Sequence, residues 1–120
     1  MSTACLLVGT TVLALASQGF DLSWNHSVEK TVWREHWVIE GGRLRLTEAA
    51  VKGSGAGMDP GPDAVLESGW WIWAPILPPV PRLNLAASGA TGGGWTICDG
   101  SDCHEIGQSP GVAIEISPCG

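Results

Sequence analysis

Three ionisable residues, His26, Glu35 and Glu48, occupy positions at which two predicted hairpins would place them side by side. An imidazole beside two carboxylates can ligate a metal such as zinc or iron, hold a cationic ligand, or act as a general base with its partner. Two carboxylates that are half-buried among tryptophans cannot both ionise without a large cost in free energy. One of them should therefore bind a proton, pair with His26 or ligate a cation.

The alternation of apolar and polar residues predicts the first hairpin. Residues 20–28 and 32–40 both show the period of two that is typical of half-buried strands. If Lys30-Thr31 formed a two-residue turn, His26 would lie opposite Glu35. A slip of one residue would expose the apolar face of one strand, so only even slips compete with this register.

The second hairpin is predicted by Gly41-Gly42, because glycines can supply the positive φ angles of a two-residue turn. Pairing across this turn sets Glu35 opposite Glu48. A row of His26, Glu35 and Glu48 would then cross three strands, with neighbouring Cβ atoms about 4.5–5.5 Å apart. The alternative is a purely structural row, a buried polar network that only fixes the strand register.

A glycine-rich stretch, residues 53–58, follows the predicted strand that carries Glu48. It is not a phosphate loop, because it lacks the terminal Gly-Lys-Ser/Thr and no helix is predicted after it. The stretch predicts either a bend of the sheet or a loop whose Ser54 and backbone amides line the carboxylate site. Ser54, Gly55 and Gly57 are therefore candidate ligand-binding residues.

Length and composition indicate one domain without long helices. The chain has 120 residues, of which 44% are hydrophobic and 15% charged, so disorder is not expected. The net charge of −6 argues against nucleic acid as a partner. The 17 glycines and 8 prolines favour short strands and many turns. We predict a single all-β domain over residues 1–120, a small antiparallel β-sandwich or open barrel of about eight strands built from hairpins.

Residues 1–16 have two interpretations. They predict either an N-terminal β-hairpin, with strands at 5–8 and 11–15, or an atypical signal peptide that ends in Ala14-Leu15-Ala16. A basic n-region is missing, and the apolar run is too short to span a bilayer. Cleavage after Ala16 would leave three cysteines, so the cysteine count favours the retained hairpin.

The four cysteines predict two disulfides. Cys98 would face Cys103 across a short hairpin, which suits a cross-strand disulfide, and Cys5 is the obvious partner of Cys119. A zinc site with His104 is the rival interpretation, although the spacing Cys-x4-Cys is not the usual one for zinc.

Tryptophan is abundant, with seven residues, and predicts an aromatic core. We expect Trp24, Trp33, Trp37 and at least one of Trp71 and Trp73 to share that core, because such clusters are more often core than ligand platforms.

Several of these segments together resemble the bacterial domain-of-unknown-function family numbered 1850. The core His-Ser-Val-Glu at 26–29 is the most distinctive part, and its Glu29 joins the ligand-binding candidates. The similar segments are residues 25–31, 53–58, 69–71, 77–79 and 88–92, together with Glu35, Trp37 and Glu48.

The resemblance implies an accessory role near a solute-uptake system. Members of that family are commonly encoded beside permeases of tripartite periplasmic (TRAP-type) transporters, and they often carry an N-terminal export segment. The implied location is the periplasm or cell envelope, while a cytoplasmic location stays open because this chain lacks the charged n-region. No activity is implied.

Three classes of function follow. The first is a binding or accessory protein with TRAP-type transporter components and a small-molecule ligand as partners, without a transmembrane span. The second is a metal-binding module that uses His26, Glu35 and Glu48. The third is a hydrolase with Glu35 as general base, but Ser27 and Ser54 lie in no nucleophile elbow. We therefore favour a non-enzymatic role, and the sequence specifies no cofactor.

Overall fold

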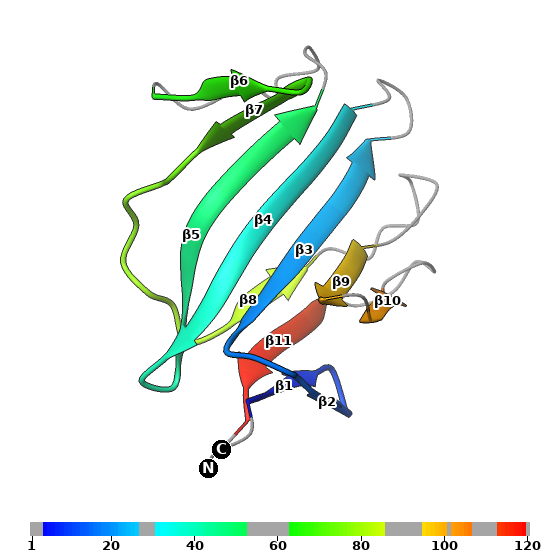
Figure 1. The fold of residues 1–120 in the computed structure, drawn as a ribbon. Coiled ribbons are helices and arrows are strands. Elements are labelled where there is room, and N and C mark those ends of the chain that lie inside the picture. Colours follow the sequence, from blue (N-terminus) through cyan, green and yellow to red (C-terminus); the bar gives the residue numbers. More distant parts are fainter. Residues whose placement is uncertain are drawn as a thin grey trace.

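The structure is a computed structural model that describes residues 4–26, 31–52, 63–85, 95–100, 102–106 and 113–119. Every regular element in these ranges is a β-strand, which confirms the all-β prediction. The described strands number eleven, more than the expected eight or so, because several are only three or four residues long. They form two open antiparallel sheets, and the smaller sheet packs across one end of the larger one (Figure 1).

The large sheet has seven strands in the order β10-β9-β3-β4-β5-β7-β6. Its centre consists of three long strands that curve along their length (Figure 1). The strands are β3 (Gly19–His26), β4 (Thr31–Glu40), β5 (Arg43–Lys52), β6 (Val65–Glu67), β7 (Trp70–Trp73), β9 (Trp95–Asp99) and β10 (Asp102–Ile106).

The small sheet has four strands in the order β2-β1-β11-β8. They are β1 (Cys5–Val8), β2 (Thr11–Ala14), β8 (Leu83–Leu85) and β11 (Ile114–Pro118). The N-terminal segment thus forms the predicted hairpin, and Gly9 takes the positive φ of 60° that its turn requires. The small sheet joins segments that are far apart in the sequence, because β1 pairs with β11.

The turn between β4 and β5 forms as predicted, with φ of 58° at Gly41 and 77° at Gly42. Arg45 closes this hairpin by donating two hydrogen bonds to one carboxylate oxygen of Glu40, from Nε at 3.0 Å and from Nη2 at 2.5 Å. The guanidinium holds the pKa of the exposed Glu40 carboxyl below its usual value.

The core lies between the two sheets at the end where they overlap. Leu6 and Ile116 of the small sheet are fully buried against Phe20, Leu22 and residues of neighbouring strands. Among the described residues, the cluster consists of Ala4, Leu6, Leu15, Phe20, Leu22, Trp37, Leu44, Leu46, Leu85, Ile97 and Ile116. These side chains alternate along their strands with more exposed ones, so the predicted period of two is the physical basis of the sandwich.

The prediction of one shared tryptophan core is wrong. Only Trp37 belongs to the buried cluster, with 8% of its surface exposed. Trp24 stacks on Trp95 with ring centroids 6.0 Å apart, and Trp33 meets Trp73 edge-on at 5.6 Å. These four rings are half-buried, and Trp95 packs against the buried cluster.

Both predicted disulfides are present. Cys5 is bonded to Cys119, with Cα atoms 5.4 Å apart, and Cys98 to Cys103, with Cα atoms 4.1 Å apart. The zinc interpretation with His104 is therefore wrong, because neither thiol of the 98–103 pair is free to ligate a metal. The described part of the chain contains no helix with the length and apolar character needed to cross a membrane.

Candidate functional site

The predicted pairing of His26 with Glu35 is wrong. In the β3–β4 ladder His26 lies opposite Thr31, and Leu22 lies opposite Glu35, a shift of four residues from the predicted register. An even shift leaves every side chain on its predicted face, so the alternation alone could not distinguish these two registers. His26 and Glu35 are consequently far apart along the ladder.

The second predicted pairing holds only as far as a β-bulge. Across the β4–β5 hairpin Trp37 pairs with Leu46 as expected, but the next pair is His36 with Glu48. Thr47 is the extra residue, and its hydroxyl donates a hydrogen bond to the His36 carbonyl at 3.1 Å. A bulge of this kind reverses the face of every residue that follows it.

The bulge places Glu48 on the opposite face of the sheet from Glu35. Ala49 instead takes the position opposite Glu35, and Glu48 is exposed. The row of His26, Glu35 and Glu48 does not form, and the metal-binding and hydrolase interpretations that used it are withdrawn.

Glu35 has a different environment, a clamp of two indole rings. Its Oε2 accepts a hydrogen bond from Trp33 Nε1 and its Oε1 accepts one from Trp37 Nε1, both at 2.9 Å. Its cross-strand neighbours Leu22 and Ala49 are buried. No arginine, lysine or histidine within the described ranges forms an ion pair with this carboxylate. The arrangement fixes the orientation of both rings.

The Glu35 clamp predicts that Glu35 and Glu48 differ in their contribution to the free energy of unfolding. We expect Glu35→Gln to lower the free energy of unfolding by about 1–2 kcal/mol, because an amide offers one acceptor oxygen to two indole donors. The matched control Glu48→Gln should change it by less than about 0.5 kcal/mol, since Glu48 is exposed. Urea unfolding of both variants measures this, and a neutral or stabilising Glu35→Gln would contradict the clamp.

An imidazole with two carboxylates does occur, but on the outer face of the large sheet. There Asp21, His36 and Glu48 lie opposite one another on β3, β4 and β5. His36 Nδ1 lies 2.8 Å from Asp21 Oδ1, with side chains 41% and 46% exposed. This row was not predicted, because the alternation places Asp21 and His36 on the solvent face. Within the described ranges, no three His, Cys, Asp or Glu side chains are grouped so as to hold a metal.

Glu48 also borders a depression on the outer face beside β7. This hollow has a volume of about 340 Å³, and its other acidic residues are Asp63 and Glu67. Because three of its eight described lining residues carry carboxylates and it is open to solvent, it presents a negatively charged surface and not an enclosed site.

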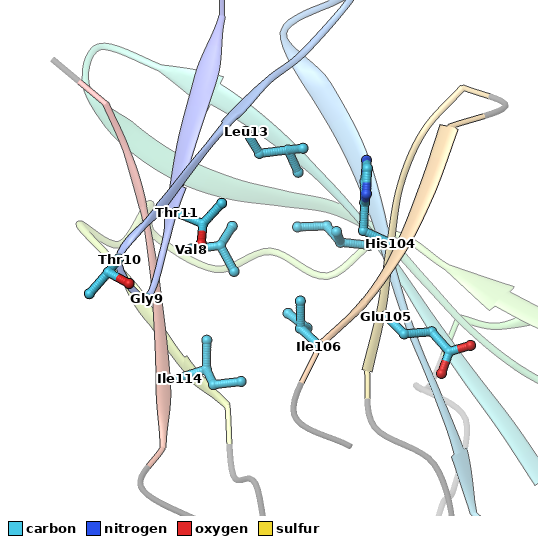
Figure 2. A pocket seen from close by; sticks show the side chains of 10 residues that line it. Val8, Gly9, Thr10, Thr11, Leu13, His104, Glu105, Ile106 and Ile114 are labelled. Carbon is cyan, nitrogen blue, oxygen red and sulfur yellow. The ribbon is translucent and has the colours of Figure 1, made fainter. Parts of the chain in front are cut away.

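A larger cavity, open on one side to solvent, lies between the two sheets, where hairpin β1–β2 faces hairpin β9–β10 (Figure 2). Its volume is about 480 Å³, within the range of small-molecule sites. It exists because β2 and β10 are the edge strands of their sheets, and among the described strands none closes the gap between them. The lining residues are Val8, Gly9, Thr10, Thr11, Leu13, Ile97, His104, Glu105, Ile106 and Ile114.

The cavity is aliphatic inside and polar at its rim. Ile97 is 1% exposed, while Leu13 and Ile106 are half-buried on opposite walls. His104 pairs with Ile97 in the ladder, so both side chains stand on the inner face of the sheet, and His104 is exposed. The Glu105 carboxylate points away from the cavity (Figure 2). Sequence reasoning missed this site because its two walls are hairpins from opposite ends of the chain.

Four of the candidate ligand-binding residues, Glu29, Ser54, Gly55 and Gly57, lie outside the described residues. The side chain of His26 is also outside what the structure describes, although its backbone forms the last pair of β3. Their role as ligands stays a prediction.

Fold and site together define a small disulfide-linked β-sandwich with an apolar cavity between its sheets. The chain belongs to the family described as domain of unknown function DUF1850, whose profile matches residues 20–106. The match covers β3 to β10, and therefore one wall of the cavity, while the β1–β2 wall precedes it. No curated protein and no solved structure is significantly similar to the chain.

Proposed function

We propose that the chain is a small, non-enzymatic binding protein of the cell envelope that serves as an accessory of a TRAP-type solute transporter. The cavity between β1–β2 and β9–β10 is its binding site in this proposal. The observation that carries the proposal is the largely aliphatic cavity of about 480 Å³ between the hairpins, since an apolar pocket with few polar groups is the usual form of a ligand site.

The compartment is supported by the two disulfides. Disulfides form and persist mainly in oxidising environments such as the bacterial periplasm, whereas cytosolic thiols are kept reduced. The link to the transporter rests on the family, whose members are commonly encoded beside TRAP-type permeases. Both points support an accessory protein outside the cytoplasm.

The chemistry of the lining favours binding over catalysis. His104 is the one ionisable side chain that faces the cavity from the described strands, and its neighbours there are aliphatic residues and threonines. General acid–base or nucleophilic catalysis requires a second group within hydrogen-bonding reach of the first. Glu35, the base of the earlier hydrolase interpretation, has a hydrogen bond to each oxygen and lies outside this lining.

A cavity-filling variant tests the proposal. Ile106→Trp should occupy the space between the hairpins and prevent binding, while the β-sheet signal in circular dichroism and the thermal unfolding midpoint stay near those of the native chain. Val65→Trp is the matched control, because Val65 is 59% exposed on edge strand β6 away from the cavity.

The readout is solute uptake by the host's TRAP-type transporter after deletion of this chain. We expect deletion to reduce uptake, the native chain and Val65→Trp to restore it, and Ile106→Trp to fail. Undiminished uptake without the chain would overturn the link to the transporter. Full rescue by Ile106→Trp would overturn the assignment of the cavity.

A further inference from the structure

We infer that the cavity between β1–β2 and β9–β10 takes a neutral aliphatic molecule with one hydrogen-bonding end, whose alkyl part lies against Ile97 and whose polar end meets His104 at the rim. This inference rests on the proposed function, and it specifies the chemical class of the ligand. Three properties of the cavity carry it: its lining, its charge and its size.

The lining matches an alkyl chain. Its apolar side chains are all aliphatic: Val8, Leu13, Ile97, Ile106 and Ile114. Figure 2 shows Leu13 and Ile106 directed into the space from opposite hairpins. Although the chain has seven tryptophans, none is among the described lining residues. A sugar or aromatic ligand would usually stack on such rings, so an aliphatic ligand fits this surface better.

The charges favour a neutral ligand. The described lining contains no lysine or arginine, and its one carboxylate, Glu105, is directed away from the space. At the rim an ionised end would lose part of its hydration with no oppositely charged side chain of the described lining directed at it, so an alkyl carboxylate or alkyl ammonium ion would lose part of the gain from its chain. The net charge of −6 disfavours anions further.

The gradient of exposure orients the ligand. The floor at Ile97 is 1% exposed and offers no polar group, whereas the imidazole of His104 is exposed at the rim. An alcohol or amide end placed there can exchange a hydrogen bond with the ring and still reach water. A volume of about 480 Å³ suits a ligand of on the order of ten non-hydrogen atoms.

A homologous series of probes tests the ligand class. Unbranched primary alcohols from n-butanol to n-decanol are titrated into the full native chain, and methyl NMR follows Leu13, Ile97, Ile106 and Ile114. We expect these methyl signals to shift and the affinity to rise about fourfold per methylene until the cavity is full. Alkanoates and alkylammonium ions of equal length should bind at least about tenfold more weakly at neutral pH.

Variants locate the bound probe. Ile106→Trp should abolish alcohol binding, and the control Val65→Trp should leave it unchanged. His104→Phe should weaken the binding of each alcohol about threefold, the size expected for one lost hydrogen bond, without altering the dependence on chain length. An unaltered affinity in His104→Phe would overturn the placement of the polar end.

The outcomes separate this inference from the proposed function. Equal affinity for alkanoates, or affinity that is independent of chain length, would overturn the neutral aliphatic class. If no alcohol binds but Ile106→Trp still fails to restore uptake, the neutral aliphatic ligand class is wrong. The cavity would then serve the transporter by binding another partner, such as a β-strand. If alcohols bind as expected while Ile106→Trp restores uptake fully, the ligand class holds and the proposed function fails.

Discussion

Replacing both Cys5 and Cys119 with serine is expected to lower the free energy of unfolding by about 4–5 kcal/mol. This disulfide joins residues 114 positions apart, so it constrains nearly the whole unfolded chain. In the chain-entropy description, the stabilisation grows with the logarithm of the loop that a disulfide closes. Denaturant unfolding of the double variant and of the native chain, both in non-reducing buffer, measures the difference.

The second disulfide provides the matched control. Cys98 and Cys103 are five positions apart, so replacing both with serine should cost only about 2 kcal/mol by the same relation. Both double variants leave no unpaired thiol. Equal losses in the two variants would contradict the entropic explanation and indicate that the disulfides act through local packing.

Local signals predicted the elements of this fold. The period of two gave the faces of β3 and β4 correctly, because it depends only on the alternation of side chains along a strand. Gly41-Gly42 fixed the second hairpin, and the spacing of Cys98 and Cys103 fixed a third. Each signal lies within about ten residues of sequence, and each needs no knowledge of how the sheets pack.

The register of the first hairpin depended on more than alternation. The pairing that forms sets Trp24 opposite Trp33 and Phe20 opposite Trp37. The predicted register, with His26 opposite Glu35, would have set Trp24 opposite Trp37. Both place large apolar residues face to face, so pair preferences of under about 1 kcal/mol each could not choose between them. Packing of the buried Phe20 against the second sheet adds a constraint that no strand carries alone.

The bulge at Thr47 was a second source of error, and it changed the candidate site completely. Without it, Glu48 would stand on the inner face beside Glu35. With it, Ala49 takes that position, and the consecutive residues Ala49, Ala50 and Val51 are all buried. In the sequence these are three consecutive apolar residues, which break the period of two, and that break is a signal that could have indicated an irregular strand.

Truncating Trp37 is expected to have the second large effect. Trp37→Ala should lower the free energy of unfolding by about 3–5 kcal/mol, the usual cost of removing a buried aromatic side chain. Trp37 is 8% exposed in the core cluster, and its indole N–H is bonded to Glu35. Trp70→Ala is the control, because Trp70 is half-buried on the outer face, where the Arg34 guanidinium lies 4.5 Å from the ring centre. That control should cost about 1–2 kcal/mol.

The cost of Trp37→Ala has two parts, and a third variant separates them. Trp37→Phe keeps most of the apolar volume but loses the N–H, so we expect a loss of about 1–2 kcal/mol. In the background of Glu35→Gln the same change should cost less, because the hydrogen bond is already weakened, and a double-mutant cycle gives the coupling. Additive losses would show that Glu35 and Trp37 do not act as a unit. A loss of stability from Trp37→Ala no greater than that from Trp70→Ala would show that the Trp37 ring is not part of the buried core.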